Sequence, residues 1–213
     1  GEAALSEYIE DGEWLHSEQG VRIFEVLEPK NLTWEVLDGI RAHTWRVKPP
    51  PHTPEGWACR FADRIAYLNH DLLDAVRAGV LEPRALPEEV VSVLGPFSGG
   101  QWIGSMIQAV LDESIRRGRI CMQADALNAM RVMRDFMFEH VYLRPESRAQ
   151  AERARRVIHD LVGHLKENPD LIPETYQLEE APLQTRVLDY VAGMTDRYAL
   201  SLHDRWFRPR GLV

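Results

Sequence analysis

A short stretch of the sequence, residues 61–74, concentrates polar side chains that could do chemistry. On a helical wheel, five of them fall within about 100° of one another: Asp63, Tyr67, His70, Asp71 and Asp74. Solvated helix faces usually mix acidic and basic residues, but this stripe contains no cation. Stacked carboxylates repel one another unless a metal ion or a hydrogen-bond donor satisfies them. The stripe therefore suggests a metal site or a polar-substrate site, and a solvated helix face is the alternative interpretation.

The donor atoms of the stripe indicate which ions it could hold. Carboxylate oxygens suit Mg²⁺ or Mn²⁺, and the imidazole of His70 adds affinity for other transition metals. The opposite side of the same segment is purely apolar, with Phe61, Ile65, Leu68 and Leu72 at helical spacing. We therefore expect an amphipathic helix that buries its apolar face and presents the polar stripe on the other.

The residues that flank the stripe predict where its helix begins and ends. The connector at residues 48–54 contains three consecutive prolines, which lack amide donors and resist the helical conformation. It is expected to be extended and on the surface. Thr53 then supplies a helix cap, and Pro54 suits the first helical position. The helix is expected to end at Gly79.

Apolar residues recur with helical periodicity along nearly the whole chain, and strict alternation is almost absent. Only residues 90–94 have strand character, and their short length leaves helix or strand open. Further helices are expected at residues 2–10, 18–27, 34–43, 102–117, 124–142, 146–166 and 183–202. The expected fold class is all-α, an irregular helical bundle that forms a single domain over residues 1–213.

Composition narrows the class of protein. The chain has 213 residues, of which 45% are hydrophobic and 27% charged, which excludes intrinsic disorder. The net charge of −8 disfavours nucleic acid as a default partner. No apolar run approaches the ~20 residues of a membrane helix, and no signal peptide is evident, so we expect a cytoplasmic protein without a membrane partner. Cys59 and Cys121 match no metal or disulfide pattern and are expected to be reduced, mostly buried thiols.

The segment that carries the stripe, DRIAYLNHD at residues 63–71, resembles a signature of bacterial deoxyguanosine triphosphate triphosphohydrolases of the HD-domain superfamily. A second specific resemblance is DYVAGMTDRYA at residues 189–199. Supporting segments follow the family's order at residues 16–19, 31–37, 77–81 and 136–142. The resemblance therefore spans nearly the whole chain, and it implies the helical fold of the HD-domain phosphohydrolases.

The resemblance also implies an activity and roles for particular residues. Such enzymes split a deoxynucleoside triphosphate, here with dGTP favoured, into deoxynucleoside and tripolyphosphate, and they use a divalent metal such as Mn²⁺ or Mg²⁺. Asp63 matches the last of the family's four metal ligands. Tyr67 and Asp71 match residues that contact the deoxyribose, by stacking and by hydrogen bonding to the 3′-hydroxyl. Glu2 matches an acid that works with a histidine in proton transfer, and His16 matches an active-site histidine that faces the phosphates.

The remaining expectations concern what this chain can do by itself. His70 belongs to the stripe and is expected to help bind substrate. The sequence starts at a Gly-Glu that ends the family's metal motif, so the other three metal ligands, a histidine and a His-Asp pair, have no match. Isolated, the chain is expected to be inactive and to hold metal weakly or not at all. The alternative is a non-catalytic helical module that binds nucleotide or mediates assembly. A homo-oligomer is expected, because relatives assemble.

Arginines are concentrated between residues 144 and 156 of this otherwise acidic chain: Arg144, Arg148, Arg153, Arg155 and Arg156. A solvated helix face, paired with neighbouring acids, is the favoured interpretation. The alternative is an anion site for triphosphate or, less favoured, for single-stranded nucleic acid, because guanidinium groups match phosphate.

Overall fold

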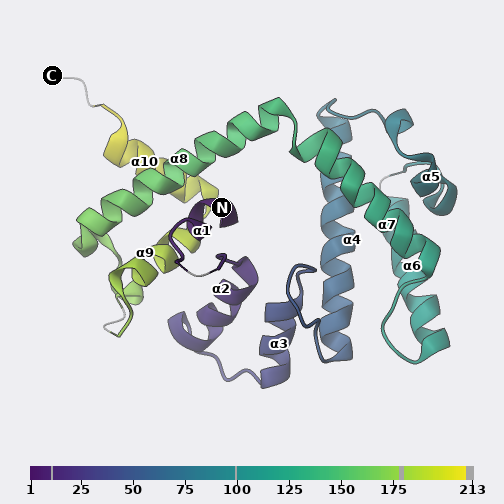
Figure 1. The fold of residues 1–213 in the computed structure, drawn as a ribbon, viewed down its shortest axis with the longest axis horizontal. Coiled ribbons are helices and arrows are strands. Elements are labelled where there is room, and N and C mark those ends of the chain that lie inside the picture. The colour runs from purple at the N-terminus through teal and green to yellow at the C-terminus, as the bar shows by residue number, and fades with distance from the viewer. Residues whose placement is uncertain (11, 99, 178–179, 210–213) are drawn as a thin grey trace. The chain divides into compact units, whose positions relative to one another are not determined.

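The computed structural model describes residues 1–10, 12–98, 100–177 and 180–209, and every regular element within them is helical (Figure 1). The α-helices are α1 (Glu2–Ser6), α2 (His16–Arg22), α3 (Trp34–Ala42), α4 (Pro54–Arg77), α5 (Glu88–Leu94), α6 (Gly100–Arg117), α7 (Ala124–Met137), α8 (Pro145–Glu167), α9 (Leu183–Ala192) and α10 (Asp196–Phe207). Two π-helical turns extend α2 and α7, at Ile23–Leu27 and Phe138–Tyr142. The expected all-α class is confirmed.

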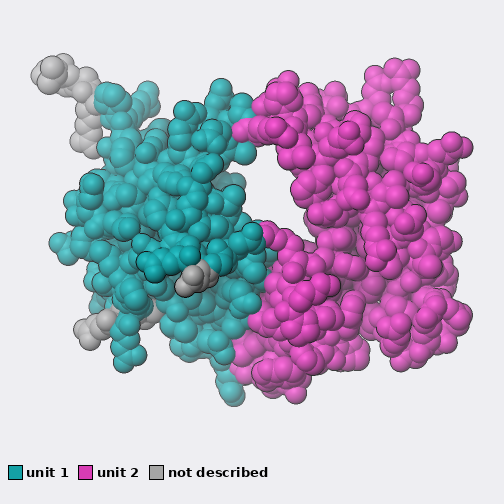
Figure 2. Space-filling view, in the orientation of Figure 1, with its two compact units in different colours: residues 1–31, 149–213 teal, residues 32–148 magenta. Residues whose placement is uncertain are grey.

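The chain divides into two compact units, which Figure 2 shows in different colours. Unit 1 consists of Gly1–Asn31 and Ala149–Val213, and unit 2 consists of Leu32–Arg148. Each unit has its own hydrophobic cluster. The single domain expected over residues 1–213 stays a prediction.

Unit 2 is built around α4, which contacts α3, α6 and α7. The apolar stripe of α4 is buried as its periodicity predicts, and Leu68 and Leu72 have no exposed surface. Trp102 and Met106 of α6 complete this core, together with four methionines. These are Met122 in the loop before α7, and Met130, Met133 and Met137 of α7. Burial of these side chains holds α4 with its opposite face outward, and that face carries the polar stripe.

Helix α4 begins and ends where its capping residues predict. The hydroxyl oxygen of Thr53 accepts a hydrogen bond from the backbone N–H of Gly56 at 3.1 Å, and Pro54 occupies the first turn. At the other end, Gly79 adopts a left-handed φ of +67°, a conformation that favours glycine. The connector is not wholly on the surface as expected, because Pro51 is buried. A Cβ added at Gly56 would lie 2.6 Å from Cβ of Pro51, so the connector packs directly on the start of the helix.

Residues 90–94 are part of helix α5, which settles the open choice between helix and strand. Three sequence-based predictions require correction. The single helix expected at 183–202 is two helices, because Thr195 caps a new one by accepting a hydrogen bond from the N–H of Tyr198 at 3.3 Å. The segment at 2–10 is helical only over Glu2–Ser6. Cys59 and Cys121 are free thiols as predicted, but Cys59 is exposed.

The core of unit 1 lies chiefly between α8 and α9. Leu161, Val162 and Leu165 of α8 are fully buried, as is Val187 of α9. Leu5 of α1 joins the same cluster, and its burial fixes the helix that carries Glu2. Among the helices that the structure describes, none combines the length and the hydropathy that a membrane crossing requires.

Candidate functional site

The polar stripe of α4 is not uniform in its surroundings. Asp63, His70 and Asp74 are exposed, whereas Tyr67 and Asp71 are partly buried. Asp74 lies 3.7 Å from the guanidinium of Arg77, both of them on the surface, so this acid behaves as part of a solvated face. The solvated-face interpretation therefore holds for Asp74, at the C-terminal end of the stripe. Tyr67 and Asp71 instead contact other parts of the protein.

Asp71 is held by a residue far away in the sequence. The hydroxyl of Tyr142, in the π-helical turn after α7, donates a hydrogen bond of 2.5 Å to Oδ2 of Asp71. Burial, and then the hydrogen bond and charge of Asp71, raise the pKa of Tyr142 well above its usual value. Tyr142 therefore stays protonated and keeps donating at neutral pH. Within the described part of the chain, Oδ1 of Asp71 accepts no hydrogen bond, so the carboxylate keeps one oxygen available.

Two arginines interact electrostatically with the tyrosines of this region, Arg64 with Tyr67 and Arg134 with Tyr142. The guanidinium of Arg64 is stacked 4.5 Å from the ring centroid of Trp45, and its buried Nε has no hydrogen-bond partner among the described residues. Burial lowers the pKa of Arg64, and the charge of Arg134 lowers it further. Arg134 lies over the ring of Phe138 at 4.4 Å, and its charge also acts on Tyr142. Cations therefore adjoin the stripe, although the stripe itself contains none.

Sequence reasoning did not select Arg64, Arg134 or Tyr142 as functional residues. Arg64 lies inside the DRIAYLNHD segment, about 100° from Asp63 on the helical wheel and therefore just outside the edge of the stripe at Asp71. Tyr142 ends a segment that supported the family resemblance, and no spacing rule links it to an aspartate 71 residues earlier. The family segments were the only available signal.

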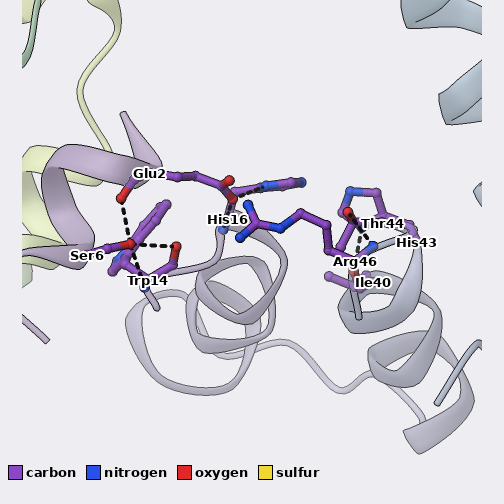
Figure 3. A network of polar contacts seen from close by, with 8 residues as sticks. All are labelled: Glu2, Ser6, Trp14, His16, Ile40, His43, Thr44 and Arg46. Atoms are coloured by element: carbon purple, nitrogen blue, oxygen red, sulfur yellow. Dashed lines mark hydrogen bonds and ion pairs between the residues drawn. The ribbon is translucent and has the colours of Figure 1, made fainter. Parts of the chain in front are cut away.

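The structure brings together the two predicted catalytic residues, Glu2 and His16, within unit 1 (Figure 3). Oε1 of Glu2 accepts a hydrogen bond from the backbone N–H of His16 at 2.9 Å and lies 2.6 Å from Nδ1 of its ring. The hydroxyl of Ser6 donates to the carbonyl of Glu2 at 2.8 Å and accepts from the N–H of Trp14 at 3.0 Å. These bonds fix α1 against the segment that leads into α2. Their catalytic roles stay predictions.

The helix that carries His16 is anchored by a buried acid. Asp189 of α9 is 2% exposed and accepts hydrogen bonds from Arg22 at 2.7–2.9 Å and from Nε2 of Gln19 at 2.9 Å. The hydrogen bond to Asp189 raises the pKa of Arg22. The second segment that resembles the family, residues 189–199, thus begins with an acid that secures α2 to α9.

The residues present do not fit a complete metal site. Across residues 1–10, 12–98, 100–177 and 180–209, no three His, Cys, Asp or Glu side chains are grouped so as to hold a metal ion. Asp63 is exposed and forms no ion pair in those ranges, so it offers a single carboxylate. One carboxylate cannot replace a cage of ligands.

The basic segment around α8 is partly paired with acids. Arg155 forms ion pairs with Glu7 and, at 3.7 Å, with Glu152, and Arg144 lies 3.4 Å from Glu146. This pairing favours the solvated-face interpretation for these two arginines.

Comparison with known proteins supports the resemblance. A family model, the phosphohydrolase-associated domain, matches residues 120–205. The deoxyguanosinetriphosphate triphosphohydrolase-like protein of Caldanaerobacter subterraneus subsp. tengcongensis is 38% identical over 215 residues, covering 98% of this chain and 62% of that protein. Proteins of the same name from Desulfatibacillum aliphaticivorans and Azorhizobium caulinodans are 32% and 30% identical, over 100% and 97% of this chain and 67% and 71% of their own length.

The chain thus spans less than two thirds of the length of the Caldanaerobacter relative and slightly more of the other two. The similarity covers both segments that carry the site residues, the DRIAYLNHD segment of α4 and the region of Glu2 and His16. This chain therefore belongs to the family of HD-type phosphohydrolases that includes the deoxyguanosinetriphosphate triphosphohydrolase-like proteins.

Proposed function

We propose that this chain shapes the sugar and phosphate pocket of a metal-dependent deoxynucleoside triphosphate triphosphohydrolase. The favoured substrate is dGTP, and the products are deoxyguanosine and tripolyphosphate. The names of the relatives support the substrate class. The observation that carries the proposal is the hydrogen bond between Tyr142 and Asp71, an acid on the helix that also presents Asp63, with Arg134 acting on Tyr142.

The sugar would be recognised by Asp71 and Tyr67. Tyr142 donates to one carboxylate oxygen of Asp71, which orients the group and leaves the other oxygen to accept a hydrogen bond from a 3′-hydroxyl. Tyr67 lies one helical turn before Asp71 on the same face, so its ring would stack on the deoxyribose. The exposed His70 would lie at the edge of this pocket.

The triphosphate would be bound by Arg64 and Arg134. A guanidinium group presents a planar fork of donors that matches phosphate oxygens, and charge-assisted hydrogen bonds of this kind are strong. Stacking on Trp45 holds Arg64 in place, and its guanidinium forms no hydrogen bond or ion pair within the described residues.

Asp63 would supply one ligand to a divalent metal, Mn²⁺ or Mg²⁺, and the other ligands would come from the length of the relatives that this chain does not span. Glu2 and His16 would handle protons, the role that the family resemblance implies for them. The contact of Glu2 with Nδ1 orients the imidazole for that role.

The test is dGTP hydrolysis with Mn²⁺, with products separated by ion-exchange chromatography. The protein at the length of its relatives should release deoxyguanosine and tripolyphosphate in equal amounts, and Asp63→Ala should abolish the reaction. The 213-residue chain should bind dGTP without turning it over. Release of pyrophosphate or orthophosphate instead would contradict the proposed reaction. Binding without turnover by the longer protein would favour a non-catalytic nucleotide-binding module.

A further inference from the structure

A second pocket lies in unit 2, among residues that are assigned no contact with the dNTP. It has a volume of about 330 Å³ and is bounded by the first half of α4, the end of α6 and the first half of α7. Small-molecule sites range over roughly 300–1,000 Å³, so this pocket suits a small ligand.

One wall of the pocket is aromatic. Trp45, Trp57 and Phe61 all line it, and the ring centroids of Trp45 and Trp57 lie 5.5 and 6.1 Å from that of Phe61. The Nε1–H of Trp45 donates to the carbonyl of Arg60 at 3.0 Å, which fixes the orientation of the indole. Trp45 and Trp57 are partly exposed, so their rings can meet a ligand. A wall of fixed rings favours a flat, apolar ligand body.

The charged residues of the pocket are unbalanced. Its one acid, Glu113, is buried and forms ion pairs with Arg116 and Arg117. Hydrogen bonding from Arg116, chiefly, lowers the pKa of Glu113 to about 2, so its charge is already matched. Arg119 and Arg131 also line the pocket, and neither makes a hydrogen bond or an ion pair within the described residues. Two cations at the pocket are therefore uncompensated.

A third uncompensated cation lies against the aromatic wall. The guanidinium carbon of Arg60 is 5.2 Å from the ring centroid of Trp45 and 5.7 Å from that of Trp57, and the residue is 2% exposed. Its Nη1 donates to the carbonyl of Ala42 at 2.6 Å, but its Nε has no partner in the described chain. A buried charge without a counter-ion destabilises the fold. An anion held nearby would offset part of that cost.

We propose that this pocket binds a small aromatic anion, a single planar ring system that bears a phosphate or carboxylate group. The ring would stack on Trp45 and Trp57, and Arg119 and Arg131 would bind the anionic group. The proposal does not rest on the proposed hydrolase function, because no lining residue of this pocket is assigned a contact with dNTP. Trp45 also supports Arg64, so a ligand here would touch the residue that positions the dNTP site.

The experiment uses the 213-residue chain and three probes: phenyl phosphate, inorganic phosphate and benzyl alcohol. Titration calorimetry and tryptophan fluorescence report the binding. Phenyl phosphate should bind at least about tenfold more tightly than either of the others, because only it engages both the rings and the arginines. Binding should quench tryptophan fluorescence, and Trp57→Phe should remove a large part of that quenching.

Matched variants locate the site. The double variant Arg119→Gln/Arg131→Gln changes two exposed side chains, so it should fold normally and bind phenyl phosphate at least about tenfold more weakly. Arg153→Gln, an exposed arginine of unit 1, is the control and should leave the affinity unchanged. Equal binding by the double variant and the wild type would overturn the proposal, as would inorganic phosphate binding as tightly as phenyl phosphate, or no binding at all.

Two further probes separate the possible sources of the ligand. A nucleoside monophosphate and benzoate are both aromatic anions, one a phosphate and the other a carboxylate. Both fit the proposal, and the tighter of the two identifies the class of natural ligand. If the difference in affinity between these two probes arises at Arg119 and Arg131, it should disappear in the double variant.

Discussion

Two aspartates of this protein show how differently an acid can be held. Asp189 of unit 1 is almost fully buried, and three donor nitrogens of Arg22 and Gln19 occupy both of its oxygens. Asp71 of unit 2 is partly buried and accepts one hydrogen bond, from the neutral hydroxyl of Tyr142.

The difference separates a structural acid from an acid that can bind a ligand. At Asp189 the charge is matched by Arg22 within the fold, so the carboxylate has little capacity left for another partner. At Asp71 the tyrosine orients the group without neutralising it, and nearby Arg134 is paired with Asp135 rather than with Asp71. Both acids lie in segments that resemble the family, so sequence similarity alone does not distinguish their roles.

The largest expected effect is on stability, and it sharpens the contrast between buried and exposed acids. Asp189→Ala should lower the free energy of unfolding by about 3 kcal/mol, because Arg22 loses the counter-ion that compensates its burial. Asp63→Ala, at an exposed position, should change it by less than about 0.5 kcal/mol. Urea denaturation followed by circular dichroism measures both. A loss at Asp63 as large as that at Asp189 would show Asp63 to be structural.

A smaller loss is expected where the donor to Asp71 is removed. Tyr142→Phe deletes only the hydroxyl, so the free energy of unfolding should fall by about 1 kcal/mol. The same change should weaken dGTP binding several-fold, because Asp71 is no longer oriented. Glu139→Gln changes an exposed side chain of the same π-helical turn that has no hydrogen bond to Asp71, and it serves as the control. Unaltered dGTP binding by Tyr142→Phe would break the assignment of Asp71 to the sugar.

The same tyrosine should leave a signature in alkaline solution. The pKa of Tyr142 is raised in the folded state, and an unfolded tyrosine titrates near about 10. Folding therefore favours the protonated phenol, and this contribution to stability is complete below pH ~10 and is lost as the pH rises further. Unfolding free energies between pH 9 and about 11 should fall less steeply in Tyr142→Phe than in the wild type. Parallel slopes would contradict the buried hydrogen bond.

The smallest expected effect concerns metal. Because Asp63 offers a lone carboxylate in the described structure, millimolar Mn²⁺ should leave the melting temperature of the 213-residue chain unchanged within about 1 °C. Asp63→Ala should behave identically in the same differential scanning experiment. A clear rise in the melting temperature that Asp63→Ala abolishes would mean that this chain assembles a metal site by itself.

Much of the fold was predictable because its signals are local. The cap at Thr53 and the left-handed Gly79 bound α4 within the sequence itself, and the period of its apolar residues predicts which face is buried. The break before α10 was missed, although Thr195 is a common capping residue, because the apolar period continues on both sides. The pairing of Glu2 with His16 was also not derivable from spacing, since the segment between them is largely irregular.

The sequence by itself determined the helical class, the limits of α4, the composition of its polar stripe and membership of the family. Only the tertiary structure decided which polar residues form hydrogen bonds with distant parts of the chain, and with which partners. Tyr142 meets Asp71 across 71 residues, and Arg22 meets Asp189 across 167. The physical reason is that caps and periodicity act within a few helical turns, whereas a hydrogen bond between distant helices exists only after packing has placed them together.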